Sequence, residues 1–104
     1  MTPLALLVAA QPAQAAPFCI PEAPVCAGLD NGRFVFTVQP APATLSVSAT
    51  ANGAPATGSM SYVTGPGYLR GWYQPFPPLV SGDVMCMSFY GMGVPPGPYC
   101  DTAP

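Results

Sequence analysis

The stretch "RFVFTVQPAPATLSVSATA" (Arg33–Ala51) decides the fold class, because its apolar residues recur at every second position. In the first half one face carries Phe34, Phe36 and Val38, and the other carries Arg33, Val35, Thr37 and Gln39; in the second half Leu45, Val47 and Ala49 alternate with serine and threonine. Successive side chains of a β-strand point to opposite faces of the sheet. The alternation therefore predicts two strands, each with one buried face.

Four further runs on either side of this stretch also have strand character. They are "PVCAGL" (residues 24–29), "SMSYVT" (59–64), "YLRGWY" (68–73) and "DVMCMSFY" (83–90). The first is short, and we expect it at a sheet edge. The last is apolar on nearly both faces, so we expect it to be central. No helical periodicity follows residue 16.

Turn residues separate these runs at regular intervals. Asn31-Gly32 lies between two apolar runs and predicts a tight hairpin, because both residues tolerate a positive φ. The chain has 16 Pro and 11 Gly, which favours many short elements. We therefore predict an all-β fold of residues 16–104: a small antiparallel β-sandwich of immunoglobulin-like or fibronectin-like type, or a small barrel, stabilised by disulfides. Such an architecture implies no function by itself.

The first fifteen residues resemble a cleavable secretory signal. "LALLVAA" (Leu4–Ala10) is apolar but too short to span a bilayer, and Ala13 and Ala15 occupy the −3 and −1 positions of a signal-peptidase site. The alternative is that this segment forms an apolar strand or helix of the folded domain. We expect residues 1–15 to be removed, no transmembrane segment in the mature chain, and a secreted or periplasmic location.

An exported chain meets oxidising conditions, so its four cysteines are expected to form two disulfides. The expected local pairs are Cys19–Cys26 and Cys86–Cys100, because proline and glycine bend both intervening loops. The pairing Cys26–Cys86 would instead join two strands across the core, and sequence does not exclude it. In the chain-entropy account each closed loop contributes about 2–3 kcal/mol of stability.

Composition excludes several classes of function. Only 6% of the residues are charged, the net charge is −2, and Lys and His are absent. A chain without a basic patch is not expected to bind nucleic acid. The usual general bases are also missing, and the one conceivable carboxylate pair, Asp30 with Asp83, lies in turn sequences. We therefore expect no catalytic activity.

The methionines and cysteines of "SGDVMCMSFYGMGVPPGPYC" (Ser81–Cys100) raise the alternative of a periplasmic Cu(I)-binding protein, because soft sulfur ligands suit that ion. The candidate ligands are Met85, Met87 and Met92, with Met60 as a further candidate. Met85 and Met87 should share one strand face, with Cys86 on the other. Packing is the competing role for these methionines. Our leading interpretation includes no metal and no cofactor.

The segment "GYLRGWYQPFPPL" (Gly67–Leu79) is the leading candidate binding surface, because it gathers residue types that are enriched in binding hot spots. The candidate residues are Tyr68, Arg70, Trp72, Tyr73 and Phe76. Tyr68, Arg70 and Trp72 should share one face, where arginine can stack on the aromatic rings. The competing interpretation is that Trp72 or Tyr73 belongs to the core.

The scarcity of charge predicts that apolar and neutral residues cover much of the surface, which favours association with a partner. We therefore expect an exported domain that acts in binding or assembly. Its expected partner is another protein or a second copy of the chain, and carbohydrate is a further candidate ligand.

Overall fold

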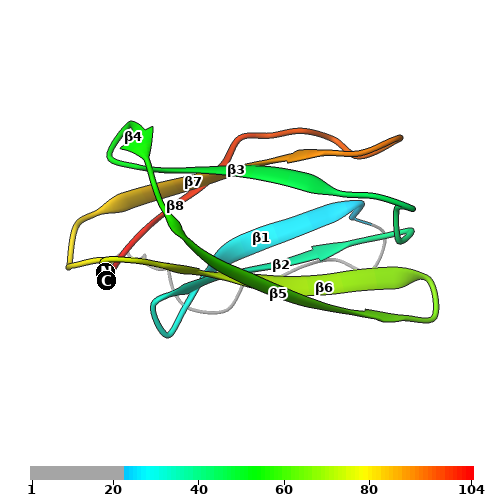
Figure 1. The fold of residues 1–104 in the computed structure, drawn as a ribbon, viewed down its shortest axis with the longest axis horizontal. Helices are drawn as coiled ribbons and strands as arrows, with labels where there is room; N and C mark the ends of the chain where they lie inside the picture. Colours follow the sequence, from blue (N-terminus) through cyan, green and yellow to red (C-terminus); the bar gives the residue numbers. More distant parts are fainter. Residues whose placement is uncertain (1–22) are drawn as a thin grey trace, which may run out of the picture.

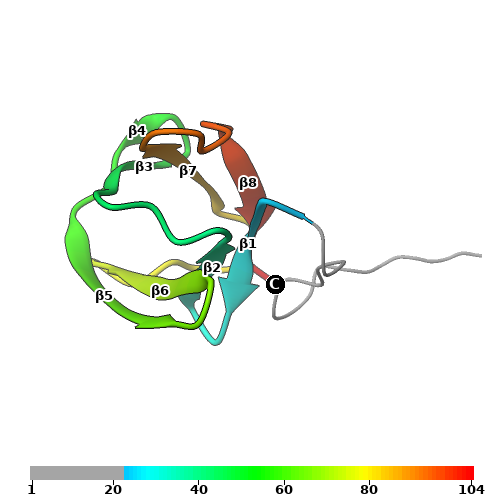
Figure 2. The same cartoon turned by 90° about the vertical axis from the view of Figure 1, so that its right-hand side faces the viewer.

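The computed structural model describes residues 23–104, and these residues form eight β-strands in two antiparallel sheets (Figure 1). The first sheet, in spatial order, contains β1 (Val25–Asp30), β2 (Arg33–Val38), β6 (Tyr68–Pro75) and β5 (Gly58–Gly65). The second contains β4 (Ala54–Pro55), β3 (Ser46–Ala51), β7 (Val84–Tyr90) and β8 (Tyr99–Thr102). The sheets lie face to face as two layers, which confirms the predicted all-β, sandwich-like fold (Figure 2).

The six predicted strands correspond to β1, β2, β3, β5, β6 and β7. β1 lies at a sheet edge and β7 in the interior of its sheet, as expected. β4 and β8 were not predicted.

Tight turns join two of the hairpins. Asn31 and Gly32, with φ values of 54° and 78°, connect β1 to β2, which confirms the predicted hairpin. Asn52 and Gly53, with φ values of 52° and 85°, connect β3 to β4 in the same way. Positive φ at both central residues matches the twist of the flanking strands, and this explains the Asn-Gly pair at each turn.

The core lies between the sheets and is built mainly from the inward faces of β2 and β7. Phe36 of β2 and Phe89 of β7 meet across the layers, with ring centroids 4.9 Å apart. The core residues are Leu29, Phe34, Phe36, Val38, Leu69, Tyr73, Met85, Met87 and Phe89. Burial of each large apolar side chain stabilises the fold by about 1.5–3 kcal/mol.

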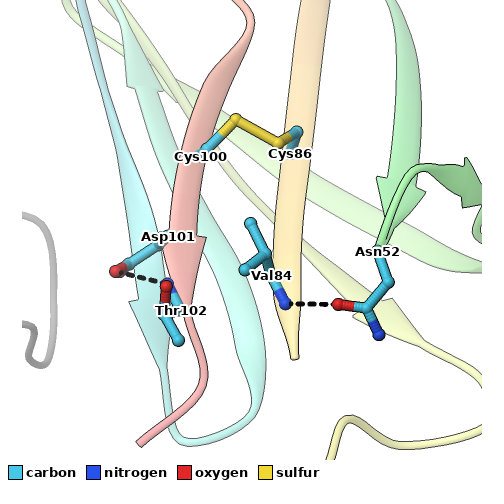
Figure 3. Close-up of a disulfide and its surroundings, with 6 residues drawn as sticks. All are labelled: Asn52, Val84, Cys86, Cys100, Asp101 and Thr102. Carbon is cyan, nitrogen blue, oxygen red and sulfur yellow. Dashed lines mark hydrogen bonds between the residues drawn. A yellow bond between two sulfur atoms is a disulfide. The ribbon is translucent and has the colours of Figure 1, made fainter. Parts of the chain in front are cut away.

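The Cys86–Cys100 disulfide joins β7 to β8 on the outer side of the second sheet, as Figure 3 shows. The two residues are direct partners in the β7–β8 register, and Cys86 alternates with the buried Met85 and Met87. The predicted Cys86–Cys100 pair is thereby confirmed. Cys26 is also disulfide-bonded, so the competing Cys26–Cys86 pairing does not occur. Cys19 and the predicted signal peptide, residues 1–15, lie outside the described residues.

The two sheets approach each other closely at the side where β8 lies beside β1 (Figure 2). There the backbone N–H of Leu29 donates to the carboxylate of Asp101 at 2.9 Å. At the opposite side β5 forms the edge of the first sheet, and residues 39–45 cross from β2 to the second sheet. The two sheets are thus hydrogen-bonded to each other on the β1–β8 side, whereas on the opposite side the second sheet leaves part of β5 uncovered.

Candidate functional site

The segment predicted as a binding surface contains the whole of β6, whose side chains alternate between the two faces of the first sheet. Leu69, Gly71 and Tyr73 point inward and are buried. Tyr68, Arg70 and Trp72 point outward and retain solvent exposure. The expectation that these three residues share one face is confirmed.

Tyr73 is a core residue rather than part of the expected binding surface. Its side chain is 9% exposed, and its hydroxyl donates a 2.8 Å hydrogen bond to the backbone carbonyl of Ala56. The strand alternation explains this correction: Tyr73 lies one position from Trp72 and therefore faces the opposite side of the sheet.

Trp72 lies in the middle of the outer face, between Val35 of β2 and Ser61 of β5 in the strand register. The guanidinium carbon of Arg33 lies 5.7 Å from the centre of the Trp72 ring. This is a cation–π distance, so the arginine helps to hold the ring in a fixed orientation. Trp72 is therefore not one of the core residues, contrary to the competing interpretation.

Arg70 is the exposed neighbour of Trp72 on the same face, with Thr37 and Val63 as its partners on β2 and β5. Arg33 and Arg70 are the only basic side chains of the chain, and the strand alternation places both on this side of the first sheet. We use the name Trp72 face for the outward surface formed by Arg33, Tyr68, Arg70 and Trp72.

Arg33 is a member of this surface that sequence reasoning did not identify. It opens β2, thirty-nine positions before Trp72, and only the β2–β6 pairing brings the two together. No local pattern in the sequence predicts that pairing. Phe76, by contrast, was expected on the surface and is 72% exposed, but it lies beyond the end of β6.

The candidate copper ligands Met85, Met87 and Met92 lie in different environments, and Met60 packs against the core cluster that includes Met85 and Met87. Met85 and Met87 are fully buried among the core side chains, whereas Met92 is 96% exposed to solvent. Met60 lies on β5, in the other sheet. Packing therefore accounts for Met85 and Met87, and the expected opposite orientation of Cys86 is confirmed.

Asp83 has a structural role in the loop before β7. Its carboxylate accepts hydrogen bonds from the backbone N–H of Val80 at 2.9 Å and from the side-chain amide of Asn52 at 3.0 Å. The bond from Val80, followed by that from Asn52, lowers the pKa of Asp83 below its ordinary value of 3.8. Asp30 is the last residue of β1, in the other sheet.

A groove of 320 Å³ opens on the inner side of β5, where the second sheet does not cover the first. Its floor includes Phe36 and Leu69, and its walls come from β5 and from the β2–β3 connection. The lining residues are Phe36, Pro42, Ala43, Thr44, Leu45, Met60, Tyr62, Thr64 and Leu69. We call it the β5 groove. The lining contains no charged residue, and no sequence pattern predicted it.

Comparison with protein-family models, with curated proteins and with solved structures finds no match for this chain. Among residues 23–104, no group of three or more His, Cys, Asp or Glu side chains is arranged to hold a metal ion. No helix in this part of the chain has the length and apolarity required to cross a membrane.

Proposed function

We propose that this chain is an exported, disulfide-stabilised, non-catalytic domain that binds a protein partner through the Trp72 face. The observation that carries the proposal is the outward position of Trp72, with Arg33 stacked at 5.7 Å. Tryptophan, tyrosine and arginine dominate binding hot spots, because they combine large contact area with directional polar groups. A ring already held in place loses little conformational freedom on binding.

The distribution of charge favours an acidic partner. Both basic side chains of the chain lie on the Trp72 face. Arg33 faces Asp30 across the β1–β2 register, whereas the register partners of Arg70 are the uncharged Thr37 and Val63, so Arg70 is the cation offered to a partner. A partner that presents a carboxylate beside an apolar patch would pair with Arg70 and pack against Trp72. Such complementarity would set specificity and the rate of association more than affinity.

We further infer that the sandwich is immunoglobulin-like. In that architecture strands A, B, E and D form one sheet, and strands C, F and G form the other. The order β1-β2-β6-β5 matches ABED, and β3-β7-β8 matches CFG, with β4 as an additional short strand beside β3. Export is supported by the predicted signal segment and by the Cys86–Cys100 disulfide, which is typical of oxidising compartments.

A capture experiment with matched variants tests the proposal. The disulfide-intact protein is immobilised and exposed to proteins extracted from the cell envelope of the producing organism. We expect a defined protein to be retained and its retention to fall about tenfold or more in Trp72→Ala, as at a binding hot spot. Tyr90→Ala, a truncation of an exposed aromatic side chain on the other sheet, is the control and should retain it.

Two results would contradict the proposal. One is equal retention by Trp72→Ala and Tyr90→Ala, which would remove the Trp72 face from the interaction. The other is retention of no protein together with binding of neutral oligosaccharides, which would be detected as quenching of the fluorescence of the single tryptophan. Circular dichroism of each variant verifies that the fold is intact.

A further inference from the structure

β5 differs from the other three strands that form sheet edges, because within residues 23–104 it lacks the features that block pairing with another strand. It runs for eight residues without a charge or a proline, and its register with β6 is uninterrupted. Unpaired edges of this kind are templates for a further strand, and folded proteins usually block them.

The other edges are blocked. β1 lies beside β8, and its Leu29 N–H is bonded to Asp101. β4 has only two residues, one of which is Pro55, which lacks a backbone N–H. β8 has four residues and carries the charge of Asp101. β5 is therefore the one long, uncharged edge among the described strands.

The ladder between β5 and β6 shows which backbone groups of β5 are unpaired. The N–H of Phe76 donates to the carbonyl of Thr57, so these two residues form a hydrogen-bonded pair at the end of the ladder. Antiparallel ladders alternate between bonded and non-bonded pairs. Continued along the register, the alternation directs the N–H and C=O groups of Met60, Tyr62 and Thr64 away from β6.

An added strand would place every second side chain on the inner face of the first sheet, where the β5 groove lies. A residue directly opposite Tyr62 has its side chain on the same face as Tyr62, which lines the groove. The exposed edge and an adjacent uncharged groove together supply the two components of strand addition: backbone hydrogen bonds and a site for alternate side chains.

We propose that the occupant is β5 of a second copy of this chain, paired antiparallel about Tyr62. In this register Tyr62 opposes Tyr62 of the second copy, and Met60 opposes Thr64 of the second copy. The backbone N–H and C=O groups of all three residues point away from β6, so each opposed pair forms two hydrogen bonds. The two first sheets then become one continuous sheet with both β5 grooves on the same side.

Charge favours a second copy as the occupant. Neither β5 nor the lining of the groove carries a charged residue, so the groove selects an uncharged extended segment, and β5 itself has that composition. Self-pairing also brings no like charges into opposition, because Arg70 lies one strand inward on β6. Tyr62 and Val63, which are 58% and 52% exposed in the single chain, would become covered.

Sedimentation velocity of the mature, disulfide-intact protein tests this proposal. We expect a dimer whose dissociation constant increases about tenfold or more in Tyr62→Lys, since two like charges would then face each other. Tyr90→Lys is the matched control, because Tyr90 is 54% exposed and lies in the other sheet; it should remain dimeric. An equimolar mixture of Tyr62→Lys and Tyr62→Glu should recover the dimer.

A monomeric wild-type protein would overturn the proposal, and so would a dimer that Tyr62→Lys leaves intact. Recovery of dimer in the mixture also excludes misfolding as the cause of dissociation. Because Trp72 faces the other side of the first sheet, Trp72→Ala should leave the dimer unchanged. A failure of this inference is thereby separate from a failure of the proposed function.

Discussion

Trp72 and Tyr73 are adjacent in sequence and have opposite environments, and this difference determines what each can do. Trp72 is oriented by Arg33 on the outside of the sheet, whereas Tyr73 is enclosed and bonded to the carbonyl of Ala56. Truncation of Trp72 removes a surface contact. Truncation of Tyr73 opens a cavity and leaves a carbonyl without its donor, so substitutions at the two positions separate binding from stability.

Tyr73→Phe should lower the free energy of unfolding by about 1 kcal/mol, because it removes one partly buried hydrogen bond and keeps the ring. Trp72→Ala should lower the free energy by no more than about 1 kcal/mol, because the half-buried ring lies outside the core and loses mainly its contact with Arg33. Urea denaturation followed by circular dichroism measures both values. A larger loss for Trp72→Ala than for Tyr73→Phe would show that Trp72 supports the fold.

Gly71→Ala should destabilise the protein by about 1–3 kcal/mol, as overpacking of a core does. An added Cβ would lie 2.5 Å from Cζ of Phe36, which is itself enclosed in the core. The same substitution at Ser61, an exposed position of β5, serves as the control for the introduction of alanine into this sheet. Thermal unfolding of both variants makes the comparison, and equal melting temperatures would refute the predicted contact.

Asp83 should make stability depend on pH in the acid range. Its pKa is lowered by the bonds from Val80 and Asn52, so the folded state favours the ionised form. The stability that this provides is present above the ordinary pKa of 3.8 and is lost as the pH falls through the lower folded value. The stability difference between wild type and Asp83→Asn should therefore shrink from about pH 6 to about pH 2. A constant difference would contradict this role.

At the scale of strands, local patterns predicted six of the eight elements, because alternation and turn residues act over a few positions. β4 and β8 were missed for a physical reason. β4 is two residues long and contains Pro55, and β8 follows a proline-rich loop and has four residues. Neither has enough positions to show a period of two. Both form because β3 and β7 offer partner edges, which is information that the local sequence does not contain.

The Cys86–Cys100 disulfide should be the main attachment of β8. It closes a loop with a sequence separation of 14 residues, for which the chain-entropy account gives about 3 kcal/mol. The double variant Cys86→Ala, Cys100→Ala should lose stability of that order, and hydrogen exchange should be fastest in β8. Unchanged protection of β8 would show that the β7–β8 ladder and the Leu29–Asp101 bond suffice without the disulfide.

For the whole molecule, the decisive feature is which side of the sandwich is left uncovered, and this could not be predicted from sequence. The alternation of "SMSYVT" identifies a strand, but it does not reveal that the inner face of β5 lies beyond the second sheet. The same holds for the Trp72 face: its β6 members were predicted, and Arg33 joins them only through the strand order. Both surfaces result from long-range pairing.

Binding at the Trp72 face and pairing through β5 should depend differently on salt, because the Trp72 face contains both basic side chains and β5 contains no charge. Raising the salt concentration from about 0.1 M to about 1 M shortens the Debye length from about 10 Å to about 3 Å. Retention of an acidic protein at the Trp72 face should then weaken severalfold. Pairing through β5 should be unchanged or stronger, since it depends on backbone hydrogen bonds and apolar burial. Sedimentation and capture at both salt concentrations measure this, and a parallel loss of both activities would mean that a single charged surface carries them.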